Sequence, residues 1–314
     1  MLIRSNGLSV VGSSLSVPSK SILNREIWPS TAEWVEKTLG IKSRMHISGE
    51  EKLIDLCIES AINALISANL KPQDINCIIV ATSTPDFINP SMAAIVHGAI
   101  GANVECPAFD LQAVCAGYIY GLGILASLAE SSGGGNFLLI GADQFSKITD
   151  FDKRDSVFFG DAAAAMIIRK SNRESIFAAE IYADGKNWTD FHTPNTTEKF
   201  MMDSKAVNRM ASEMLPNAVE TLCKKLSIKV SDISYFFTHQ PSKVVLDKIE
   251  SKLNLTEGRI YRNLSERANT ASASIPSVFY DSSQMSKIKS GDLVCFAAIG
   301  AGWVWGVAIM EWNI

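Results

Sequence analysis

Cys115 is the residue whose sequence setting best suits covalent chemistry. It lies between an extended apolar run at 107–111 and a segment at 118–129 whose apolar residues recur three and four positions apart. This pattern predicts a strand, a tight turn and a helix, with Cys115 at or just before the helix N-terminus. Backbone N–H groups and the helix dipole there would lower the pKa of a thiol below its ordinary value of about 8.5 and make it a nucleophile. The competing interpretation is an unreactive cysteine of the core.

His239 and Asn269 are the other candidates for polar chemistry. His239 ends an apolar run that begins near residue 230, and Asn269 opens the small-residue segment 269–274, NTASAS. An imidazole can hold or donate a proton near neutral pH, and an asparagine amide can donate a hydrogen bond. Taken alone, His239 also fits a hydrogen-bonded residue at a strand end, and Asn269 fits an ordinary turn residue.

Alternating strands and helices must position these three residues. In the first part of the chain, a capping-box pattern at Ser30 and Glu33 predicts a short helix at 30–36. The pattern that follows predicts a helix at 50–70, a strand at 75–82 and a helix at 91–100. The Cys115 segment and apolar runs at 137–140 and 158–168 come next. The second part repeats the order with a helix at 205–226, a strand at 230–239, the segment 269–274, and runs at 292–298 and 303–312. We therefore expect two packed α/β halves, residues 1–170 with Cys115 and residues 171–314 with His239 and Asn269. Matching strand ends would then meet across a pseudo-twofold axis.

Composition excludes several classes of protein. The chain has 314 residues, 47% of them hydrophobic, and a formal net charge of -4, which argues against nucleic-acid binding. The first residues show no signal-peptide pattern, and no apolar run approaches the roughly 20 residues of a membrane span, so we expect a cytoplasmic protein with no membrane partner. The six cysteines and four histidines form no metal-binding or disulfide pattern, so no metal is predicted.

Four motifs together resemble the β-ketoacyl-acyl-carrier-protein synthase III family of the thiolase superfamily. They are DLQAVCAG at 110–117, HQPS at 239–242, NTASASIP at 269–276 and GAGWVWG at 300–306. The segments 33–34, 40–44, 107–110 and 159–161 extend the resemblance over nearly the whole chain. It implies a duplicated five-layer αβαβα fold, usually a homodimer, and no cofactor beyond coenzyme A or acyl-carrier-protein thioesters as substrates.

The resemblance also implies a role for each candidate residue. Cys115 would be acylated by an acyl thioester, and His239 and Asn269 would assist the decarboxylative condensation of a malonyl thioester with that acyl group. The backbone N–H groups of Cys115 and Ala301 would form the oxyanion hole. By position, Trp34 and Arg154 would hold the adenine of coenzyme A. For these two residues, core packing and a solvated loop are the competing interpretations.

Several positions depart from the family pattern and bear on the substrate. Thr38, Ser242, Ala268, Ala297, Ile299 and Ala301 stand where other residues are usual. Four phenylalanines fall at or near positions of the acyl tunnel: Phe145, Phe159, Phe191 and Phe200. Because phenyl rings there would shorten or reshape the tunnel, we expect a small or unusual acyl starter.

Two other functions remain open at the level of sequence. An enzyme with the same fold could pass the acyl group from Cys115 to an alcohol, an amine or water, as an acyltransferase or thioesterase. A partner subunit without catalysis is less favoured, because Cys115, His239 and Asn269 are all present. Release of carbon dioxide from a malonyl thioester would separate the condensing enzyme from the others.

Overall fold

The computed structural model describes residues 1–171, 173–195, 197–283 and 288–313. Within these residues the chain forms two five-stranded mixed sheets. The first has the order β2 (Leu8–Ser16), β8 (Ala162–Lys170), β7 (Asn136–Asp143), β5 (Ile75–Ala81), β6 (Ala108–Leu111). The second has the order β1 (Leu2–Ser5), β9 (Phe177–Ala183), β14 (Val304–Glu311), β13 (Leu293–Gly300), β12 (Ile233–Thr238).

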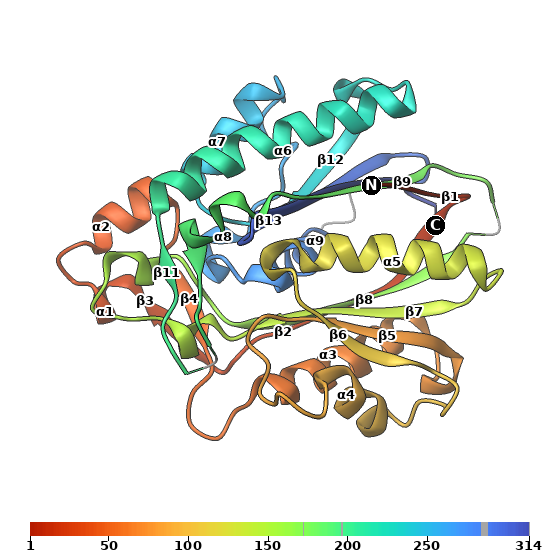
Figure 1. The fold of residues 1–314 in the computed structure, drawn as a ribbon, viewed down its shortest axis with the longest axis horizontal. Coiled ribbons are helices and arrows are strands. Elements are labelled where there is room, and N and C mark those ends of the chain that lie inside the picture. The colour runs from red at the N-terminus through yellow and green to blue at the C-terminus, as the bar shows by residue number, and fades with distance from the viewer. Residues whose placement is uncertain (172, 196, 284–287, 314) are drawn as a thin grey trace.

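Helices separate and cover the two sheets (Figure 1). The outer face of the first sheet is covered by α3 (Leu53–Ala68) and α4 (Met92–Ile100), and that of the second by α6 (Ser204–Leu226) and α7 (Lys243–Lys252). Between the sheets lie α5 (Gly117–Ser131) and α9 (Ser274–Ser283). The five layers confirm the predicted duplicated αβαβα fold. The expected division after residue 170 coincides with the end of β8 and stays a prediction.

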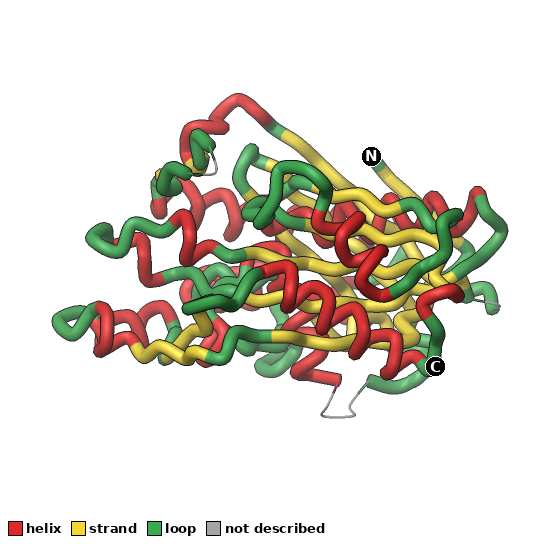
Figure 2. Tube along the Cα trace, turned by 90° about the horizontal axis from the view of Figure 1, so that it is seen from below, coloured by secondary structure: helices red, strands yellow, loops and turns green. Residues whose placement is uncertain are grey.

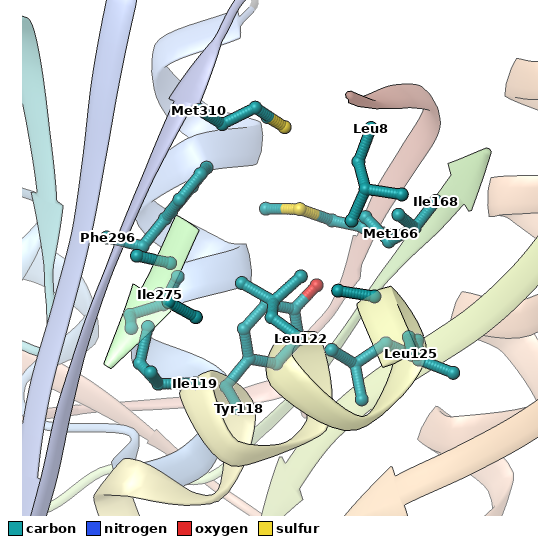
Figure 3. Packing of buried hydrophobic residues seen from close by; sticks show 14 of the residues in the cluster. Leu8, Tyr118, Ile119, Leu122, Leu125, Met166, Ile168, Ile275, Phe296 and Met310 are labelled. Atoms are coloured by element: carbon teal, nitrogen blue, oxygen red, sulfur yellow. The ribbon is translucent and has the colours of Figure 1, made fainter. Parts of the chain in front are cut away.

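The central layer is held by apolar contacts to both sheets (Figure 3). Tyr118, Ile119, Leu122 and Leu125 of α5 are buried in one cluster. Side chains from both sheets, including Leu8, Met166, Ile168, Phe296 and Met310, belong to the same cluster. Each such side chain stabilises the fold by about 1.5–3 kcal/mol through its removal from water. These contacts therefore hold the N-terminus of α5, and Cys115 just before it, in a defined position.

One segment of the described residues, Val114–Ser131, is long and apolar enough to cross a membrane by length and composition alone. It comprises α5 and the turn before it, and it lies between the two sheets with most of its residues buried. Core helices of globular proteins pass the same test, so the apolar composition of α5 is explained by its place in the central layer.

Short elements gather at one end of the sheets, at the left of Figure 1 and again at the left of Figure 2, where loops and short helices project beyond the strands. They include β3 (Lys20–Leu23), α1 (Asn24–Ile27), α2 (Ala32–Trp34), a π-helical turn (Val35–Leu39), β4 (Ser43–His46), β10 (Phe191–His192), β11 (Met201–Met202) and α8 (Leu264–Arg267). The capping box predicted at Ser30 and Glu33 is wrong. The helix begins after Thr31 without a side-chain cap, and Glu33 instead pairs with Lys37 at 2.5 Å.

Candidate active site

Cys115 lies in a 3-10 turn, Val114–Ala116, that leads directly into α5. The prediction that it stands just before a helix N-terminus is confirmed. Val114 has a φ of 46°, which is costly for a β-branched residue, on the order of 1–3 kcal/mol. The turn is thus a strained one that the surrounding core holds in place.

The environment of the Cys115 thiol does not favour the thiolate. Burial raises the pKa of Cys115 far above its ordinary value, and the charge of Asp143 raises it further. The hydrogen bonds to the thiol from its own backbone N–H and from the Asn269 side chain lower the pKa, but by less. The prediction of a lowered pKa is therefore wrong, because removal from water outweighs the helix N-terminus. Cys115 is a neutral thiol in the resting protein.

His239 directly follows β12 and is 3% exposed. Its backbone N–H donates to the carbonyl oxygen of Ala297 at 3.0 Å, which fixes it at the end of the second sheet. Burial lowers the pKa of His239 to about 3. Its Nδ1 atom has no hydrogen-bond partner among the described residues. The imidazole is neutral at physiological pH, so it carries one proton that one ring nitrogen can donate.

The amide of Asn269 is oriented by its own turn. Its Oδ1 accepts hydrogen bonds from the Ala271 N–H at 3.0 Å and from the Ser274 hydroxyl at 3.2 Å. Its backbone is bound to the first half of the chain, since its N–H donates to Phe158 and its carbonyl oxygen accepts from Gly160. With Oδ1 occupied in this way, Nδ2 is the atom that can donate to Cys115.

Ala268, one residue before Asn269, has an unusual backbone conformation. Its φ and ψ are 57° and -159°, a region that is essentially restricted to glycine. This is one of the positions where the sequence departs from the family pattern. An alanine in this backbone conformation costs about 1–3 kcal/mol of conformational free energy.

Cys115, His239 and Asn269 line one cavity of about 350 Å³. The walls of this cavity also include Trp34, Thr38, Arg154, Ser242, Ile299 and Ala301, which were selected from the sequence. Further lining residues that sequence reasoning missed include Phe158, Met202 and Trp303. The second half of the chain thus brings a histidine and an amide to the same cavity as the thiol of the first half.

The end of β13 approaches the backbone of Cys115 very closely. A Cβ atom on Gly300 would lie 2.9 Å from the Cys115 nitrogen and 3.0 Å from the Ala113 carbonyl oxygen. Only glycine fits, and this fit sets the backbone of the next residue, Ala301, beside the same cavity. The two N–H groups selected for an oxyanion hole therefore belong to segments that touch each other.

Trp34 and Arg154 lie at the cavity and contact each other. The Cζ atom of Arg154 is 4.3 Å from the centroid of the Trp34 ring, a cation–π contact. A flat ring system inserted between them would need about 7 Å, twice an ordinary stacking distance. The two side chains would therefore have to separate to hold an adenine from both sides.

The four phenylalanines form one cluster beside Cys115. Phe159 and Phe191 line the cavity that contains the thiol. Phe145 and Phe200 do not line it, but they are buried against the other two. All four phenylalanine rings thus pack together, and two of them, Phe159 and Phe191, line the cavity of the thiol.

Asp143 is a functional candidate that sequence reasoning missed. It ends β7, is fully buried, and accepts hydrogen bonds from Ser83 and Thr84 on Oδ1 and from Ser272 on Oδ2. Burial raises its pKa, and these hydrogen bonds oppose the rise. Its position at the carboxyl end of a parallel strand was a usable signal, because such ends converge on the site in α/β sheets.

A duplicated five-layer fold with a cysteine before a central helix defines the thiolase-like class of proteins. Two family models match this chain, 3-oxoacyl-[acyl-carrier-protein (ACP)] synthase III over residues 109–185 and the C-terminal model of the same family over residues 223–312. The β-ketoacyl-[acyl-carrier-protein] synthase III proteins of Rickettsia canadensis and Rickettsia prowazekii are 34% and 35% identical, each over 96% of this chain and 99% of theirs. The crystal structure of 3-oxoacyl-[acyl-carrier-protein] synthase III from Aquifex aeolicus has a TM-score of 0.93 and 30% identity, over 98% of this chain and all of that one. The chain belongs to the β-ketoacyl-acyl-carrier-protein synthase III family of condensing enzymes, which are acyltransferases.

Proposed function

We propose that this protein joins an acyl group held on Cys115 to a malonyl thioester in a decarboxylative condensation. The observation that carries the proposal is that Cys115, His239 and Asn269 line one cavity although they come from both halves of the chain. The relatives named as β-ketoacyl-[acyl-carrier-protein] synthase III support the same reaction. Primary fatty-acid initiation and a specialised pathway both use this chemistry.

In the first step the Cys115 sulfur attacks the carbonyl carbon of an acyl thioester. A new carbon–sulfur bond forms, the bond to the thiol of coenzyme A or of a carrier breaks, and the proton of Cys115 leaves with that thiol. Because the Cys115 thiol is neutral at rest, its proton must pass to the leaving thiolate during the attack, and we assign this relay to His239, which lines the same cavity. The backbone N–H groups of Cys115 and Ala301 stabilise the oxyanion, by on the order of 3 kcal/mol per donor.

In the second step the malonyl thioester loses carbon dioxide. His239 and the Nδ2 of Asn269 donate hydrogen bonds to the thioester oxygen, which carries the enolate charge once the carbon–carbon bond breaks. The enolate carbon attacks the acyl carbonyl, and the carbon–sulfur bond to Cys115 breaks. The released thiolate takes a proton from solvent or from an adjacent donor. The neutral state of His239 suits the donating role, since an imidazolium is not required.

The cavity mouth supports binding of an extended thioester carrier. Trp34 and Arg154 would separate to stack on the adenine of coenzyme A, and an acyl carrier protein would present the malonyl group at the same opening. The reaction proposed here uses thioester substrates and the side chains of the protein, with no further cofactor. The cytoplasm is the compartment in which we place it.

We further propose a homodimer, formed through the edge of the first sheet. β6 is the last strand in that sheet, and the loop before α4 exposes Phe87 and Ile88, the latter by 77%. Exposed apolar side chains beside a free strand edge are features that pairing with a second copy would cover. Light scattering after size exclusion would test this, and a monomer at micromolar concentration would overturn it.

Intact-protein mass spectrometry tests the reaction itself. The protein is incubated with a panel of acyl-coenzyme A thioesters beside Cys115→Ala. One acyl mass is expected on the native protein and none on the variant. Addition of malonyl thioester should then release carbon dioxide and remove the acyl mass. Loss of the acyl mass without carbon dioxide release would instead support transfer to water or another acceptor.

A further inference from the structure

A short segment, residues 158–161, holds the backbone of Asn269. The Asn269 N–H donates to the Phe158 carbonyl oxygen at 2.9 Å, and the Gly160 N–H donates to the Asn269 carbonyl oxygen at 3.0 Å. Asn269 and Phe159 thus pair as two residues of parallel strands do. Because both backbone groups of Asn269 are bound here, a shift of this segment would move Asn269 with it.

Asp161 anchors the same segment to the first half of the chain. Its N–H donates to the carbonyl oxygen of Met45 in β4 at 2.8 Å. Its Oδ2 accepts hydrogen bonds from the Ile47 N–H at 2.9 Å and from the Ser146 hydroxyl at 2.5 Å, and its Oδ1 accepts from the Ser146 N–H at 3.0 Å. The Asp161 side chain is 1% exposed. One buried carboxylate therefore joins three stretches of the chain.

The protonation state of Asp161 suits this anchoring. Burial raises its pKa to about 6, although the hydrogen bonds from Ser146 and Ile47 lower it. The carboxylate form therefore predominates at pH 7. An ionised carboxylate has only acceptor atoms, so it satisfies two backbone N–H groups and a hydroxyl at once.

We infer that Asp161 is a positioning residue for Asn269. By fixing residues 158–161, it aligns the Asn269 Nδ2 with the Cys115 sulfur and with the oxygen of the malonyl thioester. The inference rests on the proposed function and assigns Asp161 to its condensation step. Asp161 does not line the cavity of Cys115, so its effect on the reaction passes through the backbone of Asn269.

The kinetic test measures the two steps separately. Cys115 is acylated with acetyl-coenzyme A, excess donor is removed, malonyl thioester is added, and loss of the acyl mass is followed by intact-protein mass spectrometry. In Asp161→Asn the side-chain NH2 group would face a backbone N–H and displace the segment. The condensation rate should fall at least about tenfold, because a shift on the order of 1 Å costs up to about a hundredfold. The acylation rate should fall by a much smaller factor.

A double-mutant cycle shows whether Asp161 acts through Asn269. Asn269→Ala alone should lower the condensation rate by more than Asp161→Asn does. Adding Asp161→Asn to Asn269→Ala should then change the rate by less than about twofold. Effects that multiply would overturn the inference, because general damage to the fold would act independently of Asn269. Glu180→Gln is the matched control. Glu180 is a buried carboxylate of β9 that pairs with Lys225, so this variant should leave both rates unchanged.

Alkylation of Cys115 tests the inference without any thioester. The hydrogen bond from the Asn269 side chain lowers the pKa of the Cys115 thiol. Displacement of this amide in Asp161→Asn should therefore slow the reaction with iodoacetamide at pH 8. The same variant should cause no further slowing in the Asn269→Ala background. A native alkylation rate in Asp161→Asn would overturn the inference, whereas absence of acylation by every coenzyme A and carrier thioester would contradict the proposed function alone.

A milder variant keeps the test decisive if circular dichroism shows that Asp161→Asn does not fold. Ser146→Ala removes the hydroxyl donor to Asp161 and leaves the two backbone donors in place. Its condensation rate should fall by a smaller factor than in Asp161→Asn, with acylation nearly unchanged. Native condensation in the folded variant, or an equal fall in both steps, would overturn the inference.

Discussion

Asp143 of β7 and Ser272 of the segment before α9 are joined by two hydrogen bonds across the two halves of the chain. The Ser272 N–H donates to Asp143 Oδ2 at 3.0 Å, and the Ser272 hydroxyl donates to the same oxygen at 2.6 Å. Ser272 follows Ala271, whose φ of 49° matches the 46° of Val114 before Cys115. Ser272 is thus the counterpart of the nucleophile in the second half, and it has become an anchor for the turn that holds Asn269.

Replacement of this carboxylate should weaken both the fold and the site. Both carboxylate oxygens of Asp143 accept a backbone N–H, from Ser83 and from Ser272. In Asp143→Asn the side-chain NH2 group would face one of these donors, so we expect a loss of about 1–3 kcal/mol in the free energy of unfolding, measured by urea denaturation. Loss of the negative charge should also lower the pKa of Cys115 and speed its alkylation at pH 7. Ser272→Ala is the matched control. It should cost about 1 kcal/mol and leave the alkylation rate unchanged, and faster alkylation in both variants would show that the charge is not the cause.

Gly300→Ala should damage catalysis. The added Cβ would lie 2.9 Å from the Cys115 nitrogen, which displaces one of the two N–H donors of the proposed oxyanion hole. Removal of one such donor lowers the turnover rate by about 10²–10³-fold. Gly98→Ala in α4 is the control, because nothing lies within 4 Å of its added methyl group. If both variants retained full condensing activity, the oxyanion hole would have to lie elsewhere.

Ala268→Gly should stabilise the protein. Relief of the backbone strain at φ 57° and ψ -159° outweighs the greater freedom of glycine in the unfolded chain, for a net gain of about 1 kcal/mol. Chemical denaturation measures the change. Ala273 lies in the neighbouring 3-10 turn and has itself no positive φ, so Ala273→Gly should be destabilising by about the same amount. A loss of stability in Ala268→Gly would mean that the buried methyl group contributes more than the strain removes.

The alkylation rate of Cys115 should rise with pH without levelling off below pH 9. Burial raises the pKa of the thiol, so the reactive thiolate fraction grows about tenfold with each pH unit over this range. Mass spectrometry of the Cys115 peptide after brief iodoacetamide treatment gives the rate, with Cys115→Ser as the blank. A plateau near pH 7 would show that the helix N-terminus outweighs burial.

Burial of neutral His239 should make the protein less stable as the pH falls. The unfolded chain binds a proton near pH 6.5, whereas the folded protein binds it only near pH 3, so stability is lost as the pH falls through this window. Between pH 7 and pH 5 the loss from this residue is about 2 kcal/mol. Native protein and His239→Asn are compared by urea denaturation at both pH values. The difference between them should change by that amount in favour of the variant at pH 5, and equal pH dependence would contradict the shift.

Sequence patterns were sufficient for the elements that carry the site. The β-branched run at 75–82 became β5, and the small-residue turns at 115 and 269 both lead into central-layer helices. These features follow from local periodicity and composition, which a single chain displays directly. The family resemblance supplied the number and order of layers, which periodicity alone does not specify.

Other properties of the site depend on contacts between distant residues. The pKa of Cys115 is decided by its burial and by Asp143, neither of which is visible in the helix pattern around the cysteine. The mutual stacking of Phe145 and Phe159 joins residues 14 positions apart by packing, at 4.4 Å between centroids. The strain at Ala268 is likewise imposed by the fold, because the sequence shows only an alanine where glycine is usual.

The place of β1 in the architecture bears on how the chain folds during synthesis. β1 pairs with β9, while β2, which begins only three residues after β1 ends, pairs with β8 in the other sheet. During synthesis β1 must therefore remain unpaired until residues 177–183 have been made, and its own sheet is completed only by β14. All five strands of the first sheet lie within residues 8–170, so that sheet can form earlier, whereas the cavity around the Cys115 thiol is complete only when the second half has been made.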